Sequence, residues 1–536
     1  MMGALDYIWM GILAVLQGPE FFSILGVGVS VTIVMVALGF LLGVAVGATP
    51  GLGGPIAMAI SLPILVSIFG FTPDALLPVM GFLIGIMKGA TIGGAVPAIL
   101  FNTPGTPDAY LTTLDGYPMT ENGEARKALR VAHFSSVTGD TFSDVVLIVC
   151  APFLALLVES YLDLPEKAAL LILSLSFIAA AVGGSPAKGL ISTGLGLLAA
   201  YIGTGEDFYP RLTGGSEALQ SGLPLVSVIL GALIIGSVIY EMTTYWRERG
   251  RAERAQRQQK RQGQGLSFAL IRKLLPYIGR SAVAGTIIGA LPGIGSTLAA
   301  TIGYALGRAR YAKTKHPDDP EFGQGAPEGV ASTEAANSSV SGANLIPVLS
   351  LGIPGNAAAV FLILAAESIG GFTPGPSVFK FTTDQVNPEL VIAFGLFTCM
   401  FLANFLNWTV GGVIMRSMGV MTRIPKQILL PCVLMLTLTA IYVQETAMAA
   451  VWITLAFGVM GYLMRVFGIS PLPFMVAFIL GGRLEETLRQ AFSATGSDPW
   501  FLLNNPIAAA FMGLAALTVI IALRQDRRSS FSERKA

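Results

Sequence analysis

The chain has 536 residues, of which 53% are hydrophobic and only 12% are charged. Soluble domains carry about 25% charged residues, and a soluble chain of this length would form several domains with charged surfaces. The mean hydropathy of +0.69 and the recurring apolar runs therefore argue against a large soluble protein. The net charge of +1 by itself indicates no class of partner, and we expect no nucleic-acid partner.

Apolar stretches long enough to cross a bilayer, or nearly so, follow one another along the chain. A transmembrane helix needs about 20 mainly apolar residues. The candidate stretches are 22–46, 55–70, 75–101, 143–161, 167–182, 186–203, 223–243, 276–304, 343–369, 389–415, 428–443, 446–467, 471–482 and 506–523. Because several are short or interrupted by Gly and Pro, we predict an all-α polytopic membrane protein with about 10 to 14 membrane segments, including broken or re-entrant helices.

Two basic segments set the expected orientation. Residues 244–273 carry nine Lys or Arg against two Glu, and the tail after residue 523 carries five. Short basic segments stay in the cytoplasm, whereas the first basic residue is Lys88, so nothing holds the N-terminus inside. The run 251–262 could bind anionic lipid or nucleic acid, but a solvated loop is favoured. The predicted divisions are a first membrane repeat, a basic cytoplasmic loop, a second membrane repeat with extra helices and a basic cytoplasmic tail: 1–243, 244–273, 274–523 and 524–536.

The most informative feature is an internal duplication. VGATPGLGG (46–54) reappears as IGALPGIGS (288–296), 242 positions later, and PAILFNTPG (97–105) reappears as PVLSLGIPG (347–355), 250 positions later. The basic loop lies between the copies, so the second copy starts inside. If the first copy starts outside, the two have opposite orientation. Inverted repeats are typical of secondary transporters, which bind their substrate between the repeats near the middle of the bilayer.

Each motif combines Pro, which breaks a helix, with Gly, which tolerates non-helical backbone angles. Backbone groups exposed by such breaks are tolerated in a membrane only where protein or a water-filled cavity satisfies them. Helix N-termini at the breaks can face an anion, and unwound carbonyl groups can hold a cation. We favour a binding site over four ordinary kinks, with the candidate residues Gly47, Pro50, Gly51, Pro104, Gly105, Pro292, Gly293, Gly352, Pro354 and Gly355.

A polar stripe runs into an apolar segment of the second copy. Its members follow the i, i+3, i+7, i+10 pattern of one helical face: Glu334, Asn337, Ser341 and Asn344. Such a stripe should line a cavity rather than face lipid. At the 250-residue offset, Thr91 corresponds to Ser341 and is a further candidate.

Lys88 is the only charged residue between Asp74 and Asp108. A Lys at the centre of a membrane helix costs about 2.5–3.5 kcal/mol on insertion scales, so it needs a partner. An anionic substrate is one candidate partner. The alternatives are that Lys88 reaches the membrane interface or pairs with a carboxylate.

Asn102 and Thr103 are candidate ligands for a coupling cation. Both precede the break at Pro104, so their side-chain oxygens and the freed carbonyl groups could converge as neutral ligands. Na⁺ accepts such ligands, whereas H⁺ requires a titratable group. The second copy lacks these side chains but has two polar neighbours, Ser350 and Asn356. The alternative is a structural role, in which Asn102 caps the helix after the break.

The residues that enzymes need are not arranged for catalysis. Three cysteines lie in apolar stretches without a CxxC spacing, and two histidines lie far apart in polar loops: Cys150, Cys399, Cys432, His133 and His316. The sequence contains no GxSxG, HExxH or GxxxxGK[ST] motif. We therefore expect no enzyme activity and no cofactor other than a coupling cation.

Taken together, the motifs resemble those of the large membrane subunit of the tripartite tricarboxylate transporters. The similarity covers nearly the whole chain through GATPGLGG (47–54), KGATIGGAVPAILFNTPGTPDAYLTTLDGYPM (88–119), GALPGIGSTLAATIGYALGR (289–308), FGQGAPEGVASTEAANSSVSGANLIPVLSLGIPG (322–355), GGFTPGP (370–376) and ILGGRLEETLRQAF (479–492). Two features depart from the family: an aromatic residue often stands where this chain has Lys88, and 202–215 fits loosely. They put the substrate in question, not the class.

The resemblance implies a three-part uptake system of the bacterial inner membrane. Its other parts would be a smaller four-span membrane subunit and a periplasmic protein that binds and delivers a small carboxylate. It also implies secondary active transport driven by a Na⁺ or H⁺ gradient. A homodimer is a further candidate assembly. The repeats suggest alternating access, in which the part carrying the Pro–Gly motifs moves against a scaffold that includes 389–415 and 446–467.

Three other functions are compatible with parts of this pattern. An anion-conducting channel could be lined by the polar stripe and the broken helices, although channels more often form their pore by oligomeric symmetry or a filter loop. An intramembrane enzyme would need a nucleophile with a base or a metal pair. A different binding-protein-dependent carboxylate carrier is disfavoured by the Pro–Gly motifs.

Overall fold

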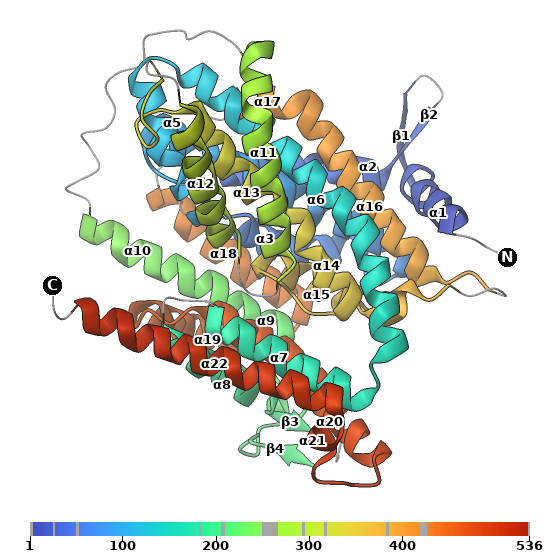
Figure 1. Cartoon of the computed structure of the whole chain (residues 1–536). Helices are drawn as coiled ribbons and strands as arrows, with labels where there is room; N and C mark the ends of the chain where they lie inside the picture. Colours follow the sequence, from blue (N-terminus) through green and yellow to red (C-terminus); the bar gives the residue numbers. More distant parts are fainter. Residues whose placement is uncertain are drawn as a thin grey trace.

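The computed structural model describes residues 4–24, 27–49, 53–181, 185–204, 209–248, 266–291, 295–315, 319–381, 385–417 and 426–533. These residues are mostly helical, with two short antiparallel strand pairs (Figure 1). The elements are α1 (Ala4–Leu16), β1 (Glu20–Ile24), β2 (Val27–Ser30), α2 (Val31–Gly47), α3 (Gly54–Phe69), α4 (Pro73–Phe101), η1 (Pro107–Tyr110), α5 (Thr112–Glu121), α6 (Ala125–Tyr161), α7 (Leu164–Ala181), α8 (Pro186–Ala200), β3 (Gly203–Thr204), β4 (Pro210–Arg211), η2 (Glu217–Leu219), α9 (Leu225–Leu230), η3 (Gly231–Ile235), α10 (Gly236–Glu248), α11 (Phe268–Gly289), α12 (Gly295–Thr314), α13 (Pro327–Ala343), α14 (Leu345–Leu351), α15 (Ala357–Ile369), η5 (Pro376–Phe379), α16 (Pro388–Leu406), η6 (Asn407–Gly411), α17 (Gly412–Ser417), α18 (Lys426–Glu445), α19 (Met448–Val466), α20 (Pro471–Ala494), α21 (Phe501–Asn504) and α22 (Pro506–Glu533).

Two groups of helices lie next to each other in Figure 1. The upper group, α2–α6 and α11–α16, carries the described residues beside the four Pro–Gly motifs, and we call it the motif group. The lower group, which we call the flank group, consists of α7–α10 and α19–α22. In it α7 and α8 pack on α20, α22 packs on α7, and α9 and α10 pack on α19. The long helix α6 leads from the motif group to α7.

Large apolar side chains are exposed on the outer faces of both groups. Val149 and Phe153 on α6 are 67% and 68% exposed, and Leu514 and Leu517 on α22 are about half exposed. Soluble monomers rarely expose contiguous apolar surfaces, so these faces are suited to lipid. Among the described residues, six helices are long and apolar enough to span a bilayer: Pro73–Phe101, Ala125–Tyr161, Leu225–Thr243, Pro388–Ser417, Met448–Val466 and Pro506–Arg524. The predicted all-α polytopic membrane fold is confirmed.

The same close helix contact occurs in both copies of the repeat. In the first copy, α2 lies so near α4 that a Cβ added to Gly43 would be under 3.0 Å from the carbonyl oxygen of Ile86. In the second copy, a Cβ added to Gly285 on α11 would likewise be under 3.0 Å from the carbonyl oxygen of Ala336 on α13. Gly43 and Gly285 are 242 positions apart and the two partners 250, the offsets of the sequence motifs. The duplication therefore extends to packing, while the inverted orientation of the copies stays a prediction.

The helix breaks at the second motif of each copy also match. Helix α4 ends at Asn102 in the left-handed conformation (φ 53°, ψ 31°), and α14 ends at Gly352 in the same region (φ 71°, ψ 22°). In both copies the amide of the next residue donates to the carbonyl of a helix proline: Thr103 to Pro97 at 3.2 Å and Ile353 to Pro347 at 3.1 Å. The sequence repeat thus produces one kind of helix end twice.

Residues 22–24 and 27–30, expected to begin the first span, form strands instead. Strand β1 pairs antiparallel with β2, and the helix begins only at Val31. The hydroxyl of Ser30 accepts a hydrogen bond from the amide of Ile33 at 3.3 Å and so caps α2. The aromatic and β-branched residues of this segment favour a strand, which hydropathy alone does not distinguish from a helix.

Two other expected spans are each divided. The stretch 276–304 is shared between α11 and α12, and 343–369 is shared among α13, α14 and α15. Both contain a Pro–Gly motif, and the helices end beside it because Pro and Gly disfavour a continuous helix. Of the two segments expected to form a scaffold, 389–415 includes α16, which packs on α2, α4 and α6 within the motif group. The segment 446–467 forms α19 in the flank group.

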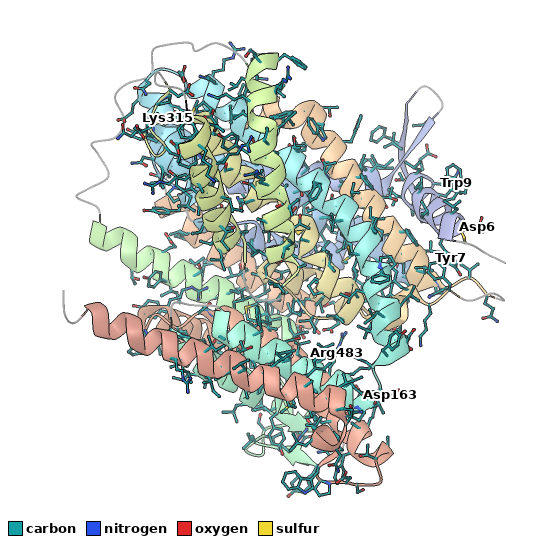
Figure 2. The ribbon with its side chains drawn as sticks, in the orientation of Figure 1. Asp6, Tyr7, Trp9, Asp163, Lys315 and Arg483 are labelled. Carbon is teal, nitrogen blue, oxygen red and sulfur yellow. The ribbon has the colours of Figure 1, made fainter. Side chains whose placement is uncertain are left out.

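Helix α1 lies outside the predicted stretches, since its 13 residues are too few for a span. It packs on α16 at the edge of the molecule, where Figure 2 labels Tyr7. The buried hydroxyl of Tyr7 accepts a hydrogen bond from the amide of Asn387 at 3.1 Å. Its ring meets Phe381 edge-on, with 5.8 Å between centroids. These contacts hold α1 to the motif group.

Candidate functional site

One cavity of ≈ 780 Å³ has walls from both helix groups. Described residues next to all four Pro–Gly motifs are among its lining residues: Gly53, Gly105, Gly295 and Asn356. The flank group contributes Leu233 and Ser237 from its π-turn and α10, and Leu472 from α20. The cavity therefore lies where the two copies of the repeat meet the flank group.

Three helices begin at this cavity. The lining includes the first residues of α3 (53–56), α12 (295–298) and α15 (356–358). The first amide groups of a helix have no partner within it, and the helix dipole favours negative charge there. Gly53 offers no side-chain cap to α3, whereas Asn356 accepts a hydrogen bond from the amide of Ala359 at 2.9 Å. Helix N-termini from both copies of the repeat thus lie at the cavity, where they favour an anion.

Asn344 contributes an unpaired amide to the cavity lining. The residue is 1% exposed, and neither Oδ1 nor Nδ2 has a hydrogen-bond partner among the described residues. A Cβ added to Gly355 would lie 2.8 Å from Oδ1 of Asn344, so the glycine leaves room for the amide. A buried amide without a partner costs about 1–3 kcal/mol, which a bound ligand can recover.

The remaining lining combines apolar and charged side chains. Met87, Ile234 and Leu472 give apolar surface. Arg465 from α19 also lines the cavity, but its guanidinium donates to the carbonyl oxygens of three flank-group residues: Ala232 at 2.8 Å, Leu233 at 2.9 Å and Gly461 at 3.0 Å. Apolar walls with a few polar groups are typical of small-molecule sites.

Several predicted site residues meet at this cavity. The predicted residues that line it are Thr91, Gly105, Asn337, Ser341, Asn344 and Asn356. Gly47 lies directly behind the lining residue Gly105, because a Cβ added to Gly105 would collide with the carbonyl oxygen of Gly47. Pro50, Gly51, Pro292 and Gly293 lie outside the described residues, as does the basic run 251–262.

Other predicted residues do not line the cavity. Asn102 and Thr103 are exposed, and the Thr103 hydroxyl donates to the carbonyl oxygen of Phe101 at 3.2 Å. Asn102 caps the end of α4, not the helix after the break. The side chain of Ser350 is bonded within its own helix. Gly352 ends α14, and Pro104 and Pro354 each lie two residues after the cap that ends α4 or α14.

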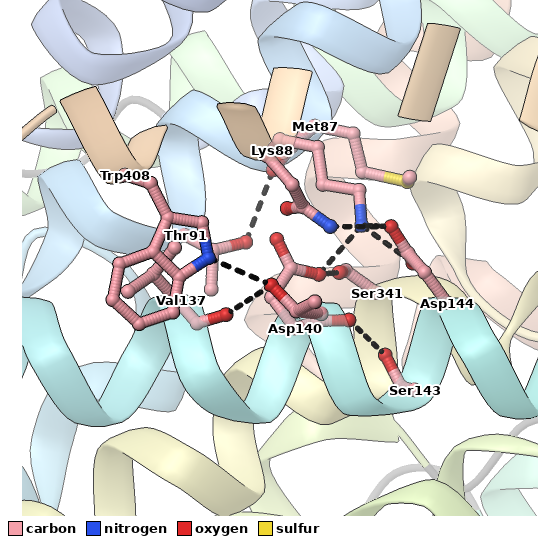
Figure 3. A network of polar contacts seen from close by, with 11 residues as sticks. Met87, Lys88, Thr91, Val137, Asp140, Ser143, Asp144, Ser341 and Trp408 are labelled. Atoms are coloured by element: carbon pink, nitrogen blue, oxygen red, sulfur yellow. Dashed lines mark hydrogen bonds and ion pairs between the residues drawn. The ribbon is translucent and has the colours of Figure 1, made fainter. Parts of the chain in front are cut away.

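Lys88 pairs with carboxylates, one of the alternatives left open by the sequence. Its ammonium lies 2.6 Å from Oδ1 of Asp140 and 2.7 Å from both oxygens of Asp144, as Figure 3 shows. Ser341, which lines the cavity, donates to Asp140, and Asn404 on α16 donates to Asp144 at 2.7 Å. Lys88 therefore does not line the cavity, and Asp140 and Ser341 connect it to the lining.

Glu334, the first residue of the polar stripe, is not in the lining. It is fully buried and accepts hydrogen bonds from the hydroxyls of Thr112 and Ser136, the latter at 2.8 Å. The helical period predicted that the residues of the polar stripe share one face of α13. It did not predict how much of that face lines the cavity, because other helices enclose α13 along its entire extent.

Asp108 and Thr297 are site residues that the sequence reasoning did not find. Both line the cavity, and the Thr297 hydroxyl donates to Oδ1 of Asp108 at 2.7 Å. The bond joins the first copy of the repeat to the second. The sequence signal that could have identified these two residues was weak. Asp108 follows TPGTP in a loop, and Thr297 has no matching polar residue in the first copy.

Asp115 joins the two copies outside the cavity lining. Its Oδ1 accepts hydrogen bonds from the amides of Gly323, Gly325 and Ala326 at 2.8–3.0 Å, directly before α13. Burial raises the pKa of Asp115, and the three amides act in the opposite direction. The carboxylate positions the start of α13, which carries the polar stripe.

The comparisons with known proteins agree with this architecture. A family model described as "Tripartite tricarboxylate transporter TctA family" matches residues 33–476. The "Uncharacterized 52.8 kDa protein in TAR-I ttuC' 3'region" of Agrobacterium vitis is 32% identical over 502 residues, covering 93% of this chain and 94% of that protein. The "Uncharacterized protein in TAR-II ttuC' 3'region" of the same organism is 32% identical over 245 residues, covering 46% of this chain and 96% of that protein.

The family match includes all four Pro–Gly motifs and the described lining of the cavity. The first relative matches almost from end to end. The chain is therefore a multi-pass membrane protein that belongs to the tripartite tricarboxylate transporter TctA family, a family of transporter components.

Proposed function

We propose that the chain is the large membrane subunit of a secondary transporter that imports small carboxylates across the bacterial inner membrane. A smaller four-span membrane subunit and a periplasmic binding protein complete the system, and a Na⁺ or H⁺ gradient drives it. The single observation that carries the proposal is the cavity between the helix groups, where three helix N-termini from both copies of the repeat converge.

The chemistry of the lining suits a carboxylate. Free amide groups at helix N-termini bind anionic oxygens, and the buried amide of Asn344 can donate one further hydrogen bond. The apolar side chains Met87 and Leu472 can contact the hydrocarbon part of a small acid. Asp108 and Glu241 also line the cavity, and their carboxyl groups disfavour a substrate that concentrates negative charge beside them.

Uptake by the reconstituted three-part system tests the proposal. Liposomes carrying both membrane subunits are supplied with the binding protein and with labelled citrate, malate or succinate in separate runs. We expect uptake that saturates, that needs the binding protein and that shows exchange against unlabelled substrate. Currents that rise linearly with voltage, without exchange, would instead support the anion-channel alternative.

Asn344→Ala tests the site itself. A hydrogen bond to a charged group contributes about 1.5–3 kcal/mol, so the half-saturating substrate concentration should rise by about tenfold or more. The matched control is Asn407→Ala, since Asn407 is also buried with an unpaired amide but does not line the cavity. It should stay within about twofold of wild type. Equal effects of the two substitutions would contradict the assignment of the cavity.

A further inference from the structure

The buried cluster of Lys88, Asp140 and Asp144 carries an unequal number of charges. The three residues are 0%, 3% and 0% exposed, so water does not screen them. Two carboxylates contact one ammonium, and the cluster has an excess of one negative charge when all three groups are ionised. A buried uncompensated charge costs several kcal/mol. The cluster therefore favours the binding of one further positive charge.

The surrounding helices supply no additional cation to this cluster within the described part of the chain. Helices α2, α3 and α14 contain no charged residue, and Arg272 and Arg280 on α11 are exposed. Several other titratable groups on helices packed against α4 and α6 have separate partners: Glu334 with Thr112 and Ser136, Asp115 with the amides before α13, His133 with the carbonyl of Asn407, Lys273 with Asp319 and Glu328, Glu367 with Arg483, and Glu389 with the amide of Thr373. The thiol of Cys399 on α16 is buried and carries no formal positive charge.

The geometry favours a proton over a metal ion. The ammonium of Lys88 already occupies the position between the carboxylates, as Figure 3 shows, and a metal ion would need that position for its oxygen ligands. A proton needs no such space. Two coupled carboxylates then share one exchangeable proton, so that one is a carboxylic acid and the other remains the counter-ion of Lys88.

The side-chain amide of Asn404 can form a hydrogen bond with Asp144 in either protonation state of Asp144. It is 2% exposed, its Nδ2 donates to Asp144, and its Oδ1 has no partner among the described residues. When Asp144 is a carboxylate, the amide donates to it. When Asp144 is protonated, rotation of the amide lets Oδ1 accept the acid hydrogen. The unpaired oxygen thus has a use only when the cluster holds a proton.

Ser341 connects the cluster to the substrate cavity. Its hydroxyl has one hydrogen, which it donates to Asp140, and the residue also lines the cavity. If the Ser341 hydroxyl donates its hydrogen bond to a substrate carboxylate instead, Asp140 loses a donor that stabilises its charged form. Substrate binding therefore increases proton binding, and by reciprocity a bound proton increases the affinity for substrate. This sign of coupling is the one that symport requires.

We propose that Asp140 and Asp144, together with Lys88, form the proton-binding site that couples carboxylate uptake to the H⁺ gradient. In each cycle one carboxylate takes H⁺ from the outer solution to become a carboxylic acid and releases it on the inner side, with no other bond made or broken. The inference rests on the proposed carboxylate transport and names H⁺ as the coupling ion.

Asp140→Asn and Asp144→Asn test the proposal in the full three-part system reconstituted in liposomes. The membrane potential is held at zero, Na⁺ is equal on both sides, and the outer pH is one unit lower. One coupled proton can then support up to about tenfold accumulation of the labelled carboxylate that wild type transports. Each variant removes the excess charge, so we expect an accumulation ratio near one. Exchange of labelled for unlabelled substrate should persist, because exchange needs no net proton movement and also shows that the variants fold.

Glu166→Gln is the matched control. Glu166 is 4% exposed and contacts Asn505 at 2.5 Å away from the cavity, and Gln keeps an acceptor for that bond. It should accumulate substrate as wild type does. Accumulation by Asp140→Asn equal to that of wild type would overturn the inference, and so would wild-type accumulation that responds only to a Na⁺ gradient. In both cases exchange would still support carboxylate transport. Absence of exchange in wild type would overturn both proposals.

Discussion

Asn102 is held in a backbone conformation that most side chains adopt only at a cost. Its φ of 53° lies in the left-handed region, where Asn is tolerated and Gly is unstrained. The residue is exposed and does not line the cavity. We therefore interpret Asn102 as a residue that ends α4, and the pair of substitutions to Gly and to Ala separates this role from cation binding.

We predict that Asn102→Gly leaves thermal stability and the Na⁺ dependence of uptake unchanged. Asn102→Ala should destabilise the protein by about 1–2 kcal/mol, since a left-handed Ala is strained. Thermal unfolding of the purified protein and uptake over a Na⁺ titration provide the two measurements. If wild-type uptake instead rises with Na⁺ and both variants need several-fold more Na⁺, the side chain is a cation ligand.

The residues of the site were partly predictable. The polar stripe gave Asn337, Ser341 and Asn344, because a helical period places them on one face whatever surrounds it. The partners of Lys88 were not predictable, although they lie one turn apart on α6. The pairing depends on how α4 and α6 pack, and the apolar stretch identified in the sequence began at residue 143, which separated Asp140 from Asp144.

At the scale of elements, glycines determine how closely helices approach in each repeat. A Cβ on Gly43 would lie under 3.0 Å from backbone atoms of α4, and a Cβ on Gly285 would lie equally close to those of α13. Backbone atoms cannot move aside as a flexible side chain can. Adding a methyl group at either position must therefore separate two packed helices.

We predict that Gly43→Ala and Gly285→Ala each destabilise the protein by about 1–3 kcal/mol, the usual cost of overpacking a filled contact. Thermal unfolding in detergent measures the effect. Gly279→Ala in α11 is the control, because a Cβ there meets no atom within 4 Å. That substitution should be neutral or stabilising by up to about 1 kcal/mol. Similar losses for all three would show that close packing at Gly43 and Gly285 does not decide the outcome.

Elements were predictable wherever length and composition decide them. The apolar stretches 75–101, 446–467 and 506–523 correspond closely to α4, α19 and the span Pro506–Arg524 of α22. The stretches with a Pro–Gly motif were expected to be broken, but the sequence does not say where each half begins. That depends on capping and on local bonds such as that from Thr103 to Pro97.

At the scale of the whole molecule, the cavity lies at a boundary between two bodies of helices. The motif group supplies the helix N-termini, and the flank group supplies the opposite wall through residues such as Ser237, Arg465 and Leu472. A displacement of one group relative to the other would change the side on which the cavity is open. Of the two segments expected to form a scaffold, 446–467 forms α19 in the flank group, whereas α16 from 389–415 packs on α4 in the motif group.

We predict that a cross-link between the two groups stops uptake reversibly. The pair Ser237→Cys and Thr301→Cys places one thiol on α10 and one on α12, both in the cavity lining. The background replaces the native cysteines with Ser or Ala, and cleavable bifunctional thiol reagents of increasing length bridge the pair. Short reagents should abolish uptake, and cleavage of the linker should restore it. Longer reagents should progressively permit transport, because they allow the groups to move apart.

The control pair is Lys315→Cys and Glu321→Cys, which lies within the motif group. These partly exposed side chains form an ion pair away from the cavity lining. Cross-linking this pair should leave uptake within about twofold of the unlinked protein, since surface ion pairs contribute only about 0–1 kcal/mol and both residues would move together. If the pair across the cavity is linked in full and uptake continues unchanged, the two groups do not move against each other. A gated pore through a static structure would then explain transport better than alternating access.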